Sequence, residues 1–192
     1  MRESQYRGLM TVAALMTATW LGWSIYNGVL KEESPGDADY LAGSTAFEDG
    51  QYLKALHDFD AALETHPEHI HARRGRARSL MQLERFDEAL AEFDTAIVAE
   101  PGFGPTIANR GILHDRMGNY QSALADYEQA MRLAPDLADG PGWMTRFLRN
   151  QPERPPTIVD RARYLRAELE KPEVERVMRI PEQDATQRPY KM

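Results

Sequence analysis

The chain has 192 residues, of which 28% are charged and 42% hydrophobic, so it holds one modest domain and is too apolar for wholesale disorder. It contains no cysteine, which excludes disulfides, thiolate zinc sites, iron–sulfur clusters and covalently attached haem. The net charge of −7 is concentrated in residues 31–137, where 20 acidic residues accompany 10 basic ones. Because so acidic a segment repels phosphate backbones, we expect no nucleic acid among its partners.

The first predicted element is a membrane-spanning helix over residues 8–30, a stretch without a charged residue. As a helix it is about 34 Å long, enough to cross a hydrocarbon core of about 30 Å. Trp20, Trp23 and Tyr26 lie near its end, where aromatic rings favour the lipid–water boundary. Basic residues precede it and acidic residues follow. The positive-inside bias therefore predicts a single-pass protein of the inner (plasma) membrane, with residues 1–7 cytoplasmic and the rest periplasmic.

A cleaved signal peptide is the alternative for this segment, with Gly22-Trp23-Ser24 as a small-x-small cleavage site. We favour the retained anchor because the apolar stretch exceeds the usual length of about 7–15 residues. Ala14, Ala18 and Gly22 share one helix face, where small side chains let two membrane helices pack closely. They are also simply common residues in membrane helices, and both interpretations stay open.

After a linker over 31–35, the sequence repeats with a period of 34 residues. Pro67, Pro101 and Pro135 mark the period, and each ends a predicted helix because proline cannot continue one. The residues between them keep one register, in the sets Gly43/Ala77/Gly111, Gly50/Glu84/Gly118, Tyr52/Phe86/Tyr120, Ala55/Ala89/Ala123, Leu56/Leu90/Leu124, Phe59/Phe93/Tyr127 and Ala62/Ala96/Ala130. Gly50 and Gly118 permit left-handed backbone at the turn between two helices.

This pattern resembles the tetratricopeptide-repeat (TPR) family, with three repeats at 36–69, 70–103 and 104–137. The resemblance implies an all-α fold in which helix pairs stack into a curved solenoid that binds other proteins. Arg76 and Arg110 depart from it, since the family usually has a leucine there; packing is then looser or made by the arginine stems. The acidic residues that recur in the second helices are expected to form a solvated outer face: Asp58, Asp60, Glu92, Asp94, Asp126 and Glu128.

The resemblance also predicts a peptide- or partner-binding groove lined by first-helix side chains. These are Tyr40, Ser44, Phe47, Arg74, Arg78, Met81, Ala108, Ile112 and Asp115. Arg74 and Arg78 lie one helical turn apart and either grip a carboxylate or phosphate together or pair with nearby acids. The carboxylate clamp of chaperone-binding members is not preserved, because its positions hold Tyr40, Ser44, Gly75, Pro105 and Asn109.

No residue pattern indicates catalysis, a cofactor or a metal site. His66, His69 and His71 cluster around a turn, where ligands rarely converge on one ion, so we interpret them as ordinary turn histidines. The chain lacks a nucleophile motif, a glycine-rich phosphate loop and a helical H-E-x-x-H. We predict that it is not an enzyme.

Residues 138–179 are predicted to form capping helices that cover the last repeat. Trp143, Met144, Phe147 and Leu148 are spaced for a short helix that packs on repeat three. A second helix begins at Thr157, with Asp160 placed for a capping box, and its apolar face holds Ile158, Ala162, Leu165 and Leu169. Residues 180–192 form an extended tail, either ordered against the solenoid or a partner, or loose.

These features favour a membrane-anchored TPR scaffold that acts as an adaptor, assembly factor or accessory subunit of a membrane protein complex. The expected partners are other protein subunits, membrane proteins among them, and lipid through residues 8–30. The alternative is an exported soluble peptide-binding or chaperone module that signal cleavage releases. The analogy is at the level of the fold, which does not fix a function.

Overall fold

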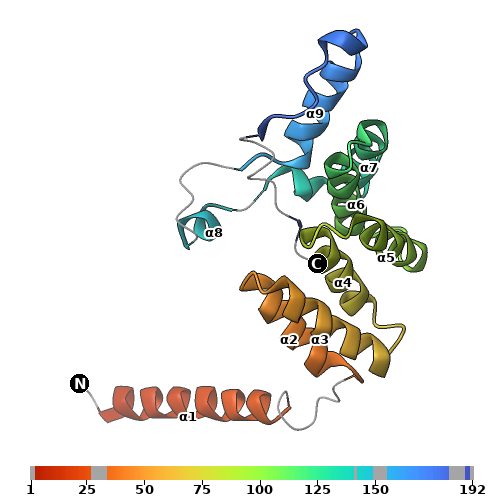
Figure 1. The fold of residues 1–192 in the computed structure, drawn as a ribbon. Helices are drawn as coiled ribbons and strands as arrows, with labels where there is room; N and C mark the ends of the chain where they lie inside the picture. Colours follow the sequence, from red (N-terminus) through yellow and green to blue (C-terminus); the bar gives the residue numbers. More distant parts are fainter. Residues whose placement is uncertain (1–2, 27–33, 141, 149–154, 182–188, 191–192) are drawn as a thin grey trace. The chain divides into compact units, whose positions relative to one another are not determined.

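The structure is a computed structural model that describes residues 3–26, 34–140, 142–148, 155–181 and 189–190. The chain divides into two units, Met1–Pro35 and Gly36–Met192 (Figure 1). The described residues form helices and connecting turns and contain no strand, in agreement with the predicted all-α class.

The first unit contains one helix, α1 (Glu3–Ile25). By length and composition its segment Arg7–Ile25 is able to cross a membrane, and its side chains are exposed. The helix thus begins before the predicted start at residue 8 and ends at Ile25, and the predicted positions 27–30 lie outside the described residues. Three threonine hydroxyls in α1 donate to the carbonyl four residues earlier at 2.8–3.0 Å. Such internal bonds satisfy polar groups that lipid cannot.

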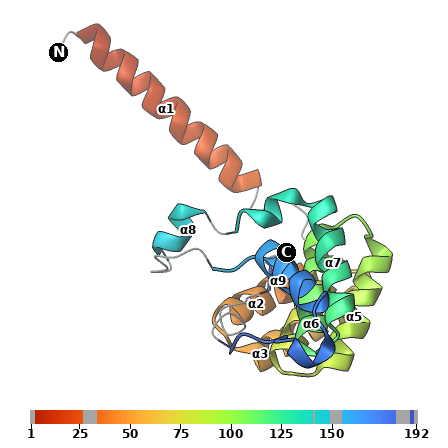
Figure 2. The same cartoon turned by 90° about the horizontal axis from the view of Figure 1, so that it is seen from above.

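The second unit begins with three helix pairs in the predicted register. They are α2 (Asp37–Glu48) with α3 (Tyr52–Thr65), α4 (Ile70–Gln82) with α5 (Phe86–Ala99), and α6 (Gly104–Arg116) with α7 (Tyr120–Leu133). Helices pack within each pair, and α3 contacts α4 while α5 contacts α6, so the pairs stack in sequence order (Figure 1; Figure 2 is a second view).

The turn inside each pair contains one residue in the left-handed region, at the position that the repeat predicted. Gly50 has φ 75° and Gly118 has φ 82°, whereas the second repeat places Glu84 there at φ 58°. A side chain in this region is strained, which is why glycine is favoured at it. The second turn is therefore the least relaxed of the three.

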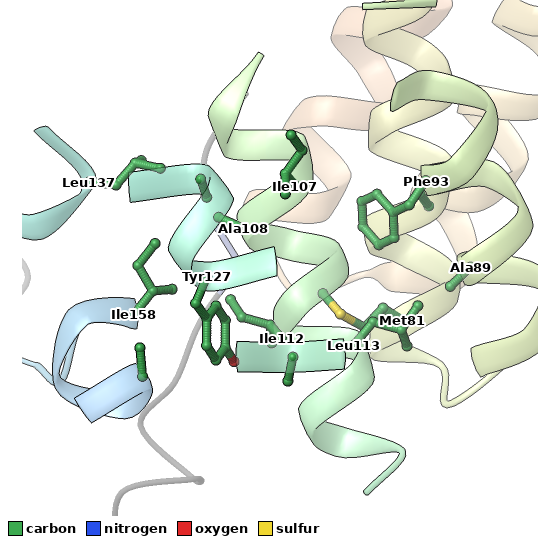
Figure 3. Packing of buried hydrophobic residues seen from close by; sticks show 14 of the residues in the cluster. Met81, Ala89, Phe93, Ile107, Ala108, Ile112, Leu113, Tyr127, Leu137 and Ile158 are labelled. Atoms are coloured by element: carbon green, nitrogen blue, oxygen red, sulfur yellow. The ribbon is translucent and has the colours of Figure 1, made fainter. Parts of the chain in front are cut away.

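An aromatic ring from each second helix fills the space between the paired helices. Phe59, Phe93 and Tyr127 are fully buried, and Figure 3 shows Phe93 and Tyr127 among the apolar side chains of the core. Glycines let the helix backbones approach these rings: a Cβ on Gly43 would lie 2.9 Å from the Phe59 ring, and one on Gly111 would lie 2.8 Å from the Tyr127 ring. The small residues of the repeat are thus explained by close helix approach.

Two arginines that depart from the family pattern connect neighbouring repeats. Arg76 donates to Asp60 at 2.6 Å and to Glu92 at 2.5 Å. Arg110 donates to Asp94 at 2.8 Å and to both oxygens of Asp126 at 2.7 and 2.8 Å. Each arginine joins an acid of the previous repeat to an acid of its own, and the hydrogen bonds raise the pKa of Arg110.

The predicted solvated outer face is found only in part, since Asp94 is exposed whereas Asp126 is buried. Each of the six has a basic partner in the structure: four pair with Arg76 or Arg110, Asp58 lies 3.8 Å from the Lys54 ammonium, and Glu128 accepts from Arg166 at 2.6 Å. Arg76 and Arg110 replace the apolar contact that is usual at their positions with charge-assisted hydrogen bonds between repeats.

The elements after the repeats are η2 (Pro135–Ala138), α8 (Trp143–Leu148), α9 (Ile158–Leu169) and η3 (Glu173–Glu175). Helix α9 begins with the predicted capping box, in which the backbone N–H of Thr157 donates to Asp160 at 3.0 Å. It packs against α7 and buries Ile158, Ala162 and Leu165 in the same core as repeat three (Figure 3). This helix is the cap of the solenoid.

Helix α8 forms where the spacing predicted a helix, but two of its apolar side chains do not pack on repeat three. Met144 is 51% exposed and Phe147 is 75% exposed. Met144 and Phe147 therefore do not cover the last repeat as their spacing predicted, and the element that packs against α7 is α9.

Candidate peptide-binding face

The nine predicted groove residues lie on the first helices α2, α4 and α6, and we call them the first-helix face. Three are half-buried, namely Tyr40, Ser44 and Phe47, and six are buried, namely Arg74, Arg78, Met81, Ala108, Ile112 and Asp115. The exposure of this surface therefore decreases from repeat one toward repeats two and three.

Arg74 on α4 is paired with an acid of its own repeat, although its Nε has no hydrogen-bond partner. Its guanidinium hydrogen-bonds Glu100 and lies 4.0 Å from the centre of the Phe103 ring, and only 1% of the residue is exposed. Of the two alternatives that the sequence left open, the structure places Arg74 against a nearby acid. It does not point both arginines of α4 at one open anion site.

Arg78, one turn further along α4, has a different environment. Its guanidinium stacks 4.6 Å from the centre of the Phe47 ring, and its Nε has no hydrogen-bond partner. Burial lowers the pKa of Arg78, because a low-dielectric environment disfavours the charged form. Arg78 thus fills the space between α2 and α4 chiefly through its stem and its contact with an aromatic ring.

Aromatic rings and histidines cluster beside these arginines. The Tyr40 ring lies 5.1 Å from His69 and 5.9 Å from His71. His69 caps α4 by accepting from the Ala72 backbone at 3.2 Å, and its other ring nitrogen lies 3.0 Å from Asp37. Burial lowers the pKa of His71, and the charge of Arg74 adds to that effect. Across the described part of the chain, no three His, Asp or Glu side chains converge as a metal site would require.

On α6, the predicted groove residue Asp115 is half of a buried ion pair. Arg161 of α9 donates from Nε and one terminal nitrogen to its two oxygens at 2.7 and 2.8 Å, and both residues are 5% exposed. Tyr127 also donates its hydroxyl to Asp115 at 3.2 Å. A bidentate pair of this kind fixes α9 on the last repeat. Asp115 therefore holds the cap in place.

The other two predicted residues of α6 belong to the apolar core. Ala108 and Ile112 are fully buried in the cluster that includes Ile158 of α9 (Figure 3), and Met178 and Tyr190 of the C-terminal segment pack against that cluster. Their binding to a partner stays a prediction, and their surface is covered by residues of this chain.

Asn109 is the residue that sequence reasoning passed over, since it was noted only as a departure from the carboxylate clamp. Its amide nitrogen donates to the Tyr190 carbonyl at 3.1 Å, and its amide oxygen accepts from the Tyr190 backbone N–H at 2.7 Å. The available signal was a side-chain amide in the middle of an otherwise apolar helix face, because such a group is seldom buried without partners.

The stacked helix pairs, with their largely buried first-helix face, define a helical-repeat module. The chain belongs to the tetratricopeptide repeat family: models of that family match residues 40–103 and 106–137, together half of the chain. It is a protein–protein interaction module, built on a scaffold that is generally not enzymatic.

Two curated relatives show how far the similarity extends. Tetratricopeptide repeat protein 6 of Homo sapiens is 31% identical over 86 residues, which cover 45% of this chain and 16% of that protein. The Hsp70-Hsp90 organizing protein of Triticum aestivum is 27% identical over 93 residues, covering 48% of this chain and 16% of that protein. The chain thus matches less than a fifth of the length of these relatives.

Solved structures share the fold at low identity. The first TPR of Spaghetti (RPAP3) bound to the HSP90 peptide SRMEEVD superposes with a TM-score of 0.58 at 16% identity, covering 75% of this chain and 100% of that chain. The Sgt2 TPR domain from Aspergillus fumigatus gives a TM-score of 0.53 at 20% identity, covering 71% of this chain and 85% of that chain. At such identities the likeness shows the fold alone.

Proposed function

We propose that this protein is a membrane-anchored adaptor or accessory subunit whose TPR module binds another protein of a membrane complex. The observation that carries the proposal is the joining, in one chain, of an interaction module and a helix with exposed apolar side chains along Arg7–Ile25. An exposed apolar surface of this length is costly in water and favourable in a bilayer.

The composition of α1 supports its retention in a membrane. Trp20 and Trp23 are 62% and 66% exposed, and they suit the lipid–water boundary at one end of the span. The threonine hydroxyls bonded within the helix add no unsatisfied polar group. With Arg7 at the start of the span and acidic residues after its end, the proposed orientation places the TPR module on the periplasmic side.

The small residues of α1 are proposed to contact a partner helix. Ala14 and Ala18 are exposed, and a Cβ added at Gly22 would meet no atom within 4 Å. They lie on the helix face opposite Met16, Trp20 and Trp23. One face thus offers bulky groups to lipid and the other offers close backbone approach.

The first-helix face argues against the partner chemistry named for one solved relative. An HSP90 peptide such as SRMEEVD carries acidic side chains and a C-terminal carboxylate. Here the clamp positions hold Tyr40, Ser44, Gly75, Pro105 and Asn109, none of which is a cation. Since Arg74 is committed to Glu100, we propose a partner other than a chaperone C-terminus.

Membrane fractionation and mild-detergent purification test the proposal. We expect the protein to resist salt and carbonate extraction and to co-purify with membrane protein subunits at fixed stoichiometry. Ala18→Ile should reduce that recovery, whereas Ala13→Ile, on the opposite face of α1, serves as the matched control. A soluble mature protein that begins at Ile25 and migrates alone would instead support the exported module released by cleavage.

A further inference from the structure

The backbone of Tyr190 is hydrogen-bonded by a buried side-chain amide of the third repeat. Asn109 lies on α6 and is fully buried, and its two polar atoms bond the N–H and the carbonyl of the same residue at 2.7 and 3.1 Å. A side-chain amide has one donor group and one acceptor group, so this pairing suits the backbone of an extended chain whatever side chain it carries. Asn109 therefore pairs with the backbone of residue 190 and not with its side chain.

The Tyr190 side chain is bound by elements that follow the last helix pair. Its hydroxyl donates to the Leu137 carbonyl in η2 at 3.2 Å and accepts from the Ile158 backbone N–H at the start of α9 at 3.3 Å. The ring packs against the core cluster beneath. A phenylalanine would keep the ring contacts but leave both backbone groups without this partner, so the site distinguishes tyrosine from phenylalanine.

The residues just before the tail are also fixed on α6 and α9. The Arg179 guanidinium donates to the Arg116 carbonyl at the end of α6 at 2.7 Å, and the Met178 carbonyl accepts from Arg161 at 2.8 Å. The described parts of the C-terminal segment therefore contact two points of α6, near Arg116 and at Asn109. Helix α6 is one of the three first helices, whose side chains the family pattern assigns to ligand binding.

We infer that Asn109, Leu137 and Ile158 form a subsite for an extended peptide that presents a tyrosine, and that the chain's own Pro189-Tyr190 occupies it. The inference rests on the proposed function, since it specifies how the TPR module selects a partner. The tail acts as a built-in competitor, because tethering gives it a high effective concentration at the site. A partner peptide must displace the tail to reach the part of the first-helix face that lies on α6.

A fluorescent peptide with the sequence of residues 178–192 tests this, titrated into the full-length chain in detergent micelles. We expect Tyr190→Ala to bind the peptide at least about 10-fold more tightly than the unaltered chain, since its tail keeps only the backbone bonds to Asn109 and competes less well. The same peptide with Tyr190→Phe should bind about 5- to 100-fold more weakly, for the loss of two hydrogen bonds.

Asn109→Ala should abolish binding, with its circular dichroism spectrum and unfolding midpoint as controls for folding. If that variant does not fold, the comparison of the two peptides still decides, because it changes no residue of the repeats. Equal affinity of the Tyr190→Ala and unaltered chains, equal affinity of the two peptides, or no binding would overturn the inference. If the inference fails but membrane subunits still co-purify, the proposed function stands. If the peptide binds as expected but no subunits co-purify, the proposed function fails and the tyrosine subsite stands.

Discussion

The first-helix face of α4 and that of α6 differ in where their buried charges find partners. Arg74 and Arg78 of α4 are accommodated by residues of the repeats themselves, namely Glu100, Phe103 and Phe47. Asp115 of α6 depends on Arg161, which lies 46 positions later on the capping helix. The buried charges of the first-helix face therefore find their partners within the repeats on α4 and outside the repeats on α6.

This difference indicates that the cap is part of the third repeat's structure. Without the cap, the Asp115 carboxylate would lose its cationic partner and the apolar core beside α6 would be exposed to water. Both changes cost stability. The α4 half has no such dependence. The four predictions below measure how far the two halves differ, and they all use urea unfolding of the full-length chain in detergent micelles.

The largest effect is expected from Arg161→Leu. The change leaves the Asp115 carboxylate buried and without its bidentate partner, which typically costs about 3–5 kcal/mol. Arg163→Leu on the same helix is the control, because its side chain is 75% exposed and lies 3.8 Å from Asp160. An exposed pair of this kind is worth about 0–1 kcal/mol. Equal midpoints for the two variants would contradict the proposed role of the cap.

Gly75→Ala tests the close packing of α4 against α3, on which this part of the module depends. A Cβ at this position would lie 2.4 Å from the Phe59 ring of α3, so either the ring or the helix must shift. We expect a loss of about 1–3 kcal/mol from overpacking, reduced by about 1 kcal/mol for the better helix former. Gly102→Ala meets no atom within 4 Å and should be tolerated. Similar stabilities would show that α4 does not depend on this close approach.

Arg78→Met compares directly with Arg161→Leu, since both remove a buried arginine. Arg78 has an unpaired Nε and stacks on Phe47, so an apolar side chain of similar length keeps most of its packing. We expect the stability to change by no more than about 1 kcal/mol, or to rise. A loss as large as that of Arg161→Leu would mean that the α4 half also relies on a buried ion pair.

The smallest effect is a pH dependence at the end of the cap. A hydrogen bond from Lys171, followed by one from the Val177 backbone, lowers the pKa of Glu168 below its ordinary 4.5. The carboxylate therefore stabilises the fold above pH 4.5. This contribution is lost as the pH falls through the lowered pKa. Glu168→Gln should flatten the loss of stability on acidification, and Lys171→Met should move it to higher pH. An unchanged acid limb in both variants would exclude this contribution.

Much of the repeat architecture followed from the sequence, because it depends on short-range periodicity. The 34-residue spacing of prolines, alanines and aromatics predicted the helix pairs and the turn positions, and the Thr157–Asp160 pair predicted the start of α9. Such features are fixed by backbone geometry within one or two turns of helix. The repeat also predicted which residues share the first-helix face.

The links between repeats could be read only in part. Arg76 and Arg110 each lie 16 positions from both of their acidic partners, a spacing present in the sequence but given meaning only by the stacking of neighbouring repeats. The acidic residues consequently looked like a solvated face. A charge pattern shows which residues are acidic, but it does not show which of them face a cation.

The sequence by itself determined that this protein is a three-repeat helical module preceded by an apolar helix, since both depend on local periodicity and composition. The tertiary structure decided which of the predicted groove residues remain accessible. Asp115 meets Arg161 and Asn109 meets Tyr190 across 46 and 81 positions, and no local rule specifies contacts at those separations. They form because buried polar groups require partners, and the fold brings those partners from the cap and the tail.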